Sequence, residues 1–250
     1  MDRFRQPEIP RHYLGARLVG LHLGMTMDRE AWLAERRREV EKDYTRDGAT
    51  YDEGYDSKTP LHLQFVRRII ELSPPDGIVL NAACGTGRYT GMVLEGGLQI
   101  IGTDQSQGML ARAAEKYPDV RFEPVGLQEL QFEGEFDAAM CIDAMEHVPP
   151  EEWPQVLANL GKALHPGGLL YLTVEETDPE ELDQAYEEAR AAGLPALHGE
   201  DIRDGTGGYH FYPSRERVRT WLTEAGFTVL EDADEWFDSW GYHHLLTRAR

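Results

Sequence analysis

Hydrophobic residues in the middle of the chain form short continuous runs, and helical patterns fill the spaces between them. The runs that begin at Ile78, Leu98, Phe136 and Leu169 have the length of buried β-strands, and a shorter strand is expected at 120–122. Strands and helices that alternate in this way predict a parallel sheet with helical crossovers. Ligands of such folds bind at the carboxyl ends of the strands.

Helices are predicted where apolar residues recur at steps of three and four. The first begins at Thr59-Pro60 and places Leu61, Phe65, Ile69 and Leu72 on one face, before the turn at 74–77. Further helices are predicted at about 88–94, from the cap Ser106 to Pro118, from Pro149 to His165 and from Pro213-Ser214 to Gly226. Two last strands, at about 227–231 and 240–247, complete the predicted sheet.

Two segments lie outside this alternation. Residues 1–60 are rich in charge and aromatic side chains, with a helix predicted at 29–40, a turn at 45–54 and no strand. Residues 176–212 are acidic, with a helix from Asp178 to about Gly193 and a glycine-rich loop at 199–208. No linker divides the chain, so we expect one domain over 1–250. It comprises an N-terminal helical extension or cap (1–60) and a core (61–250) that carries 176–212 as a lid insertion over the strand ends.

Composition and charge narrow the class of partner. The chain is 41% hydrophobic, which is enough for a substantial core. Its 45 acidic and 25 basic residues give a formal net charge of −20, which argues against a face that neutralises nucleic-acid phosphates or binds anionic membranes. We therefore expect a small-molecule partner, although an acidic surface also serves solubility alone.

Cysteine usage and hydropathy favour a cytoplasmic protein. Cys84 and Cys141 each follow a hydrophobic run, as is typical of buried, reduced thiols. The N-terminal residues lack the apolar centre of a signal peptide, and no apolar run approaches the roughly 20 residues of a membrane-spanning helix.

The turn after the first predicted strand, Asn81-Ala-Ala-Cys-Gly-Thr-Gly87, is the best candidate for a ligand site. Gly85 and Gly87 allow a ligand to approach the main chain, and the following helix offers unpaired N–H groups. Asp104 ends the second strand, where an acidic residue can bind both hydroxyls of a ribose. A nicotinamide dinucleotide and S-adenosylmethionine both fit this pattern.

Four sequence motifs, taken in their order along the chain, distinguish between these two candidate cofactors. A dinucleotide site needs a third glycine or alanine where this chain has Thr90, although Gly91 permits a looser spacing. By contrast, the set Asn81-Ala-Ala-Cys-Gly-Thr-Gly-Arg, Ile101-Gly-Thr-Asp-Gln-Ser-x-x-Met-Leu, Phe136-Asp-x-x-x-Cys-Ile-Asp-Ala-Met-Glu-His-Val and Leu164-His-Pro-Gly-Gly closely resembles the small-molecule branch of the class I S-adenosylmethionine-dependent methyltransferases. The resemblance runs from about residue 60 to the end.

That resemblance implies a Rossmann-like α/β fold, in which a seven-stranded, mostly parallel sheet has helices on both faces and an antiparallel last strand. S-adenosylmethionine would be the cofactor and S-adenosylhomocysteine the product. The implied cofactor-binding residues are Gly85 and Gly87 with Asn81, Ala83 and Cys84 in the same turn beside the methionine part, Asp104 at the ribose, Gln105, Met109, Leu127 and Gln128 around the adenine, and the main chain of Cys141 or its neighbour Ile142.

Two residues depart from the family pattern. The family usually has Asp or Glu at the position of Asn81 and glycine at that of Ala83. An asparagine can accept a hydrogen bond but gives up charge attraction to an ammonium group.

The resemblance as a whole predicts methyl transfer to oxygen or nitrogen of a small molecule. A non-catalytic relative that only binds the cofactor and an NAD(P)-dependent oxidoreductase are the alternatives.

Residues outside these motifs complete the predicted site. A base is needed when the attacking atom arrives protonated, and His147 and His210 are the candidates. The spacing Asp143-x-x-Glu146-His147 resembles a Glu-x-x-Glu-His metal site of some methyltransferases, but it has no clear further ligand except His210, so we predict no metal. Tyr51 and Tyr55 resemble a tyrosine segment that closes over the cofactor in related enzymes.

Overall fold

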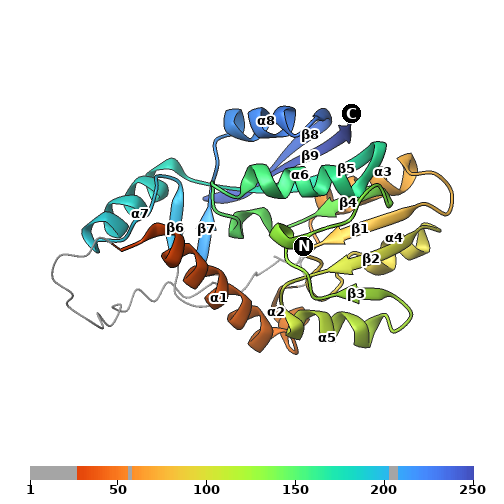
Figure 1. The fold of residues 1–250 in the computed structure, drawn as a ribbon, viewed down its shortest axis with the longest axis horizontal. Helices are drawn as coiled ribbons and strands as arrows, with labels where there is room; N and C mark the ends of the chain where they lie inside the picture. The colour runs from red at the N-terminus through yellow and green to blue at the C-terminus, as the bar shows by residue number, and fades with distance from the viewer. Residues whose placement is uncertain (1–26, 56–57, 203–207) are drawn as a thin grey trace, which may run out of the picture.

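A seven-stranded sheet forms the centre of the molecule (Figure 1). The computed structural model describes residues 27–55, 58–202 and 208–250. The strands of the sheet are β1 (Ile78–Ala82), β2 (Gln99–Thr103), β3 (Arg121–Glu123), β4 (Phe136–Cys141), β5 (Leu164–Thr177), β8 (Phe227–Phe237) and β9 (Trp240–Ala249), in the order β3-β2-β1-β4-β5-β9-β8. All neighbours are parallel except β9, which runs antiparallel to β5 and β8. The predicted fold class is confirmed.

Helices cover both faces of this sheet. They are α3 (Pro60–Leu72), α4 (Thr90–Glu95), α5 (Gln107–Lys116), α6 (Trp153–Ala163) and α8 (Arg215–Glu224), with short 3₁₀ helices at Leu127–Glu129 and Met145–His147. Successive residues of a strand point to opposite faces, and Val79 and Leu80 accordingly belong to different core clusters. The Val79 cluster packs against α3 and α4, and the Leu80 cluster against α6 and α8. Strands buried on both sides explain the continuous apolar runs.

Side-chain caps start three of the helices as predicted. Thr59, Ser106 and Ser214 each accept a hydrogen bond from a main-chain N–H three residues later. The face predicted for α3 is only partly right, because Leu72 is 40% exposed. His62 takes a buried place on that helix instead.

Several element boundaries differ from the sequence prediction. The predicted start at Pro149 is a turn, and α6 begins at Trp153. Strand β5 begins at Leu164, before the Pro-Gly-Gly that we expected to precede it, because a register shift in β4 accommodates those residues. Strand β8 continues to Phe237 rather than 231. Beyond residue 231, exposed residues alternate with half-buried ones and none is fully buried, so pairing with β9 defines this part of the strand.

The segment before the core is more helical than predicted. Helix α1 (Arg29–Asp47) continues well past residue 40, and α2 (Tyr51–Tyr55) occupies the predicted turn. Only Trp32 and Val40 of α1 are buried, so no apolar stripe marks the end of the helix. The main chains of α1 and α5 are in contact at Gly108. A Cβ atom added to this glycine would lie only 2.1 Å from the Thr45 carbonyl oxygen.

The predicted lid insertion contains two strands that the sequence did not indicate. Helix α7 (Pro179–Ala191) agrees with the prediction. The region predicted as a loop instead holds β6 (Glu200–Ile202), which pairs antiparallel with β7 (Tyr209–Phe211). Each strand has three residues, too few to produce a recognisable alternation. Helix α1 lies beside this pair in Figure 1.

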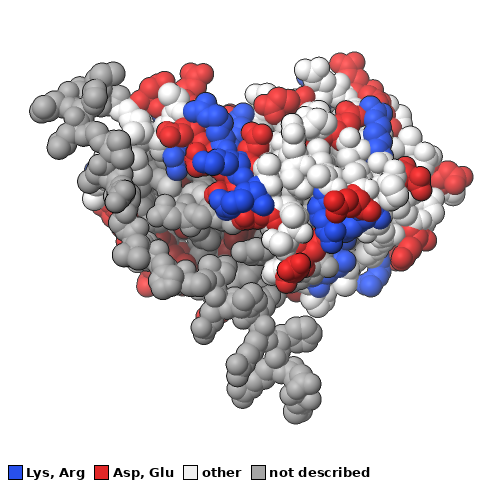
Figure 2. Space-filling view, turned by 90° about the horizontal axis from the view of Figure 1, so that it is seen from below, with Lys and Arg blue, Asp and Glu red and all other residues white. Residues whose placement is uncertain are grey.

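Charged side chains are unevenly distributed on the surface. Figure 2 views the side on which α1, α2 and α5 lie in Figure 1, and shows basic side chains in clusters among acidic ones. Arg112 and Lys116 of α5 donate to the Asp52 carboxylate of α2 over 3.2 and 3.0 Å. Within the described ranges, no helix is both long enough and apolar enough to cross a membrane.

Candidate active site

The loop between β1 and α4 leaves open space beside its main chain. Ala83, Gly85 and Gly87 have φ angles of 54°, 53° and 77°, a left-handed conformation that suits glycine. A Cβ on Gly85 would meet nothing within 4 Å, so this residue borders empty space. A Cβ on Gly87 would lie 3.1 Å from Thr90 Oγ1, so Gly87 shapes the turn and packs inward.

Asp104 joins the ends of β1 and β2. Its Oδ2 accepts a hydrogen bond from the Gly85 N–H over 2.9 Å, and its Oδ1 accepts from the Ser106 N–H over 2.8 Å. Burial raises the pKa of Asp104 to about 6, while the hydrogen bonds from Ser106 and Gly85 act in the opposite direction. Each carboxylate oxygen has a second lone pair with which it can accept a further hydrogen bond.

A pocket opens at these strand ends, with about 990 Å³ of empty space counted to its open mouth. Most of the predicted site residues line it: Tyr51, Asn81, Ala83, Cys84, Gly85, Asp104, Gln105, Met109, Leu127, Gln128 and His147. They come from five separate stretches of the sequence: four lie at or after the ends of the parallel strands β1 to β4, which end at the same edge of the sheet, and Tyr51 belongs to α2. The mixed polar and apolar lining is that of a small-molecule site.

The remaining predicted site residues lie elsewhere. Gly87 and Cys141 are absent from the described lining, and Ile142 lines the pocket beside Cys141. Cys141 is buried, because β4 points its side chain into the core. His210 lies behind His147 rather than in the wall. Tyr55 belongs to α2, and its side chain lies outside the described part of the chain.

Several residues that line the pocket were not predicted from the sequence. The additional lining residues are Arg37, Val40, Tyr44, Thr86, Arg88, Tyr89, Val125, Gly126, Asp143, Ala144 and Val148. Those on α1 had no signal, since that helix shows no motif and little periodicity. Arg88 directly follows the glycine turn, and this position was the available clue.

A charged network lies beside the glycine loop. Arg88 Nη1 donates to Asp143 Oδ2 over 2.9 Å, and His62 Nε2 is 2.9 Å from Asp143 Oδ1. Burial acts to raise the pKa of Asp143, but His62 and Arg88 outweigh it and hold the pKa below its usual value. A stable carboxylate therefore fixes the Arg88 guanidinium in the pocket wall.

The two candidate bases are adjacent, with ring centroids 4.8 Å apart. His147 Nε2 lies 3.0 Å from Tyr44 Oη, and His147 Nδ1 lies 3.0 Å from the Tyr209 carbonyl oxygen. His210 Nδ1 lies 2.7 Å from Glu175 Oε2. In the described ranges, no three His, Cys, Asp or Glu side chains are grouped as ligands of a metal ion.

The residues at the strand ends fit an adenosine cofactor with an amino-acid tail. The Asn81 side chain is 3% exposed, and its Nδ2 has no hydrogen-bond partner among the described residues. A buried polar atom in a pocket wall is a place for a ligand to bind. The open space at Gly85 and the half-buried carboxylate of Asp104 meet the needs of a polar tail and a ribose.

Comparison with known proteins agrees with this arrangement. A methyltransferase-domain family matches residues 79–168. An uncharacterized methyltransferase of Geobacillus kaustophilus is 29% identical over 191 residues, which cover 74% of this chain and 84% of that protein. A ubiquinone biosynthesis O-methyltransferase of Xanthomonas axonopodis pv. citri is 25% identical over 72% of this chain and 74% of that protein.

The fold has a close counterpart among solved structures. The 1,6-didemethyltoxoflavin-N1-methyltransferase of Burkholderia thailandensis, solved with 1,6-didemethyltoxoflavin and S-adenosylhomocysteine, superposes with a TM-score of 0.62 at 18% identity. The match covers 95% of this chain and 98% of that one. This likeness shows the fold, and the methyltransferase domain over residues 79–168 and the named relatives support a class I methyltransferase with S-adenosylmethionine as its cofactor.

Proposed function

We propose that the chain transfers a methyl group from S-adenosylmethionine to a small-molecule acceptor that binds between the strand ends and α1. The observation that carries this proposal is the composition of the pocket wall. Gly85 and Asp104 line the pocket from the core, while Arg37 and Tyr44 line it from α1. One cavity thus offers a place for the cofactor and a second, polar wall for an acceptor. The similar proteins include a ubiquinone biosynthesis O-methyltransferase and an N1-methyltransferase solved with bound 1,6-didemethyltoxoflavin, which supports a small acceptor.

The residues of the core wall have proposed roles in holding the cofactor. Asp104 accepts the ribose hydroxyls, and Gly85 and Asn81 border the methionine part. Gln105, Met109, Leu127 and Gln128 surround the adenine, and the main chain of Ile142 replaces that of Cys141 at its amino group. When bound, the cofactor supplies a methyl group already activated by a sulfonium, so the chain contributes mainly position and the management of the acceptor proton.

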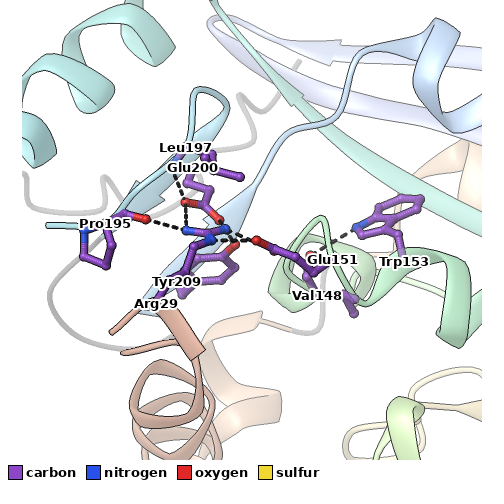
Figure 3. Close-up of polar contacts among 8 residues, drawn as sticks. All are labelled: Arg29, Val148, Glu151, Trp153, Pro195, Leu197, Glu200 and Tyr209. Atoms are coloured by element: carbon purple, nitrogen blue, oxygen red, sulfur yellow. Dashed lines mark hydrogen bonds and ion pairs between the residues drawn. The ribbon is translucent and has the colours of Figure 1, made fainter. Parts of the chain in front are cut away.

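A cover formed by α1 and residues 176–212 is proposed to select the acceptor. Arg29, at the start of α1, donates to Glu200 Oε1 and Oε2 over 2.6 and 3.0 Å and to the Pro195 carbonyl over 2.6 Å (Figure 3). Arg29 also pairs with Glu151. Glu200 is fully buried and accepts a further hydrogen bond from Tyr209 Oη over 2.6 Å. The two parts of the cover are therefore fastened to each other beside the pocket.

Calorimetry with S-adenosylhomocysteine tests the cofactor site. We expect the wild-type chain to bind, Asp104→Ala to lose binding, and the matched control Asp119→Ala, at an exposed turn, to bind as the wild type does. A wild-type chain that binds NADH and not S-adenosylhomocysteine would contradict the proposal.

Catalysis requires a second experiment. Incubation with methyl-labelled S-adenosylmethionine and a panel of phenols, carboxylic acids and amines should give a labelled product. Binding without any labelled product across such panels would instead indicate the non-catalytic relative that Asn81 left open.

A further inference from the structure

Helix α1 and strand β7 place a polar atom on each side of the His147 ring. The Tyr44 hydroxyl comes from α1, 103 residues before His147, and the Tyr209 carbonyl comes from β7, 62 residues after it. Both ring nitrogens of His147 are thus within hydrogen-bond distance of a fixed partner, at 3.0 Å each. Tyr44 and His147 line the pocket next to each other.

These partners determine which ring nitrogen carries the proton. A carbonyl oxygen can only accept, so Nδ1 of His147 donates its proton to Tyr209. In the neutral ring Nε2 then has a lone pair, and the Tyr44 hydroxyl donates to it. The basic nitrogen of His147 therefore faces the hydroxyl of Tyr44, and the side chains of both residues line the pocket.

Tyr44 cannot act as the base alone. Burial, with contributions from Tyr51, Glu146, Glu175 and Asp104, raises the pKa of Tyr44 well above its ordinary value. The side chain is therefore a phenol at neutral pH, with an oxygen lone pair that can accept a hydrogen bond from a bound molecule. When the Tyr44 oxygen receives a proton from a bound molecule, it must give up the proton of its own hydroxyl group. His147 Nε2 can accept that proton.

We propose that Tyr44 and His147 form a proton relay for an acceptor that carries a hydroxyl group. The O–H bond of the acceptor breaks and its proton moves to Tyr44 Oη, while the proton of Tyr44 moves to His147 Nε2. The acceptor oxygen keeps the electron pair and becomes the nucleophile, and His147 later returns its proton to solvent. The proposal rests on the proposed function and narrows its substrate class to alcohols, phenols or enols.

Acidic side chains lie near the pair formed by Tyr44 and His147. The carboxyl groups of Glu146 and Glu175 are close enough to contribute to the raised pKa of Tyr44. His210 lies against the His147 ring and is bound to Glu175. Nearby negative charge stabilises an imidazolium, as a base that must accept a proton requires.

Tyr209 is a positioning residue for this relay. Its hydroxyl donates to the buried Glu200, which Arg29 also binds (Figure 3). Its ring packs edge-on against that of Trp32, with centroids 6.1 Å apart. These contacts hold the carbonyl that orients His147. The two parts of the cover therefore contribute one residue each to the relay, Tyr44 and Tyr209.

Nitrogen NMR of histidine-labelled protein tests the arrangement without an acceptor. We expect His147 at neutral pH to be the tautomer protonated on Nδ1, and Tyr44→Phe to shift its Nε2 resonance and its titration. The matched control Tyr186→Phe, on α7, should change neither. A proton on Nε2 of His147, or no response to Tyr44→Phe, would overturn the proposal whether or not an acceptor is known.

Kinetics with two probes test the relay itself. Catechol has protonated hydroxyls at neutral pH, whereas 4-nitrobenzenethiol is already ionised and needs no base. We expect Tyr44→Phe and His147→Gln each to lower kcat on catechol by about 10²–10⁴-fold, and the double variant to lose no more, because the two act as a unit. The thiol needs no base, so the loss of turnover on the thiol should be at least about tenfold smaller than the loss on catechol in each variant.

The outcomes separate the relay from the proposed function. Equal losses on both probes would indicate a structural role for Tyr44 and refute the relay. A wild-type chain that methylates the thiol but no hydroxyl compound would also refute it. A chain that neither binds S-adenosylhomocysteine nor methylates any probe would refute the proposed function, while the NMR result would still decide the relay geometry.

Discussion

Asp104 needs an ionised carboxyl group to accept hydrogen bonds from a ribose, but the burial of this group disfavours ionisation. In the free protein its pKa rises from 3.8 to about 6 because of this burial. Because the pKa of Asp104 is higher in the folded than in the unfolded protein, protonation of this carboxyl group stabilises the fold. This contribution to stability is complete below about pH 4 and is lost as the pH rises through about 6. The two-unit shift corresponds to about 3 kcal/mol, at 1.36 kcal/mol per unit.

Cofactor binding should reverse part of this effect. Hydrogen bonds from two ribose hydroxyls stabilise the ionised carboxylate and lower its pKa. If only the ionised form binds, about one molecule in eleven is competent one pH unit below the pKa, so affinity falls by about tenfold. We therefore expect the Kd of S-adenosylhomocysteine to be about tenfold weaker at pH 5 than at pH 7, with proton release on binding near pH 6.

Calorimetry at pH 5, 6, 7 and 8, in two buffers that differ in their heat of ionisation, measures both quantities. Asp119→Asn should keep the pH dependence, since that residue is exposed and does not line the pocket. Asp104→Asn should lose the pH dependence along with most of the affinity. Equal wild-type affinity at pH 5 and pH 7, or binding at pH 6 without proton release, would refute the reasoning.

Three further substitutions test individual contacts. Ala83→Gly should stabilise the protein by about 0.5–1 kcal/mol, because relief of a left-handed alanine exceeds the extra chain entropy of glycine, and the melting temperature should rise by about 1–4 °C; a lower melting temperature would contradict this. Arg29→Ala leaves Glu200 buried without its cation and should destabilise the β6–β7 pair by about 3–5 kcal/mol in hydrogen exchange, whereas Arg46→Ala at an exposed pair should cost less than about 1 kcal/mol; equal effects would refute the assigned burial. Gly108→Ala should cost about 1–3 kcal/mol of unfolding free energy by forcing α1 outward, and an unchanged denaturant midpoint would contradict that contact.

The core of the fold was predictable because local signals and global packing agree. Continuous apolar runs mark strands that are buried on both faces, and a cap such as Ser106 marks the start of a helix. Asp104 could be identified from its place at the end of a strand that neighbours the glycine turn. These signals lie within a few residues of the feature they predict.

The other side of the pocket was not predictable for a physical reason. Helix α1 is held by ion pairs and by a few buried residues such as Trp32, so its sequence resembles that of an exposed helix. The contact of Tyr44 with His147 joins positions 103 residues apart, and no local pattern records it. The same applies to β6 and β7, whose pairing depends on partners outside each strand.

The contact between α1 and α5 also has a consequence for engineering the acceptor range. Main chain meets main chain at Gly108, with no side chain between them that could be exchanged to move the helix. The width of the pocket on that side is therefore fixed by the backbone. A library designed to admit larger or differently charged acceptors should keep Gly108 and vary the side chains that α1 presents to the cavity, at Arg37 and Val40.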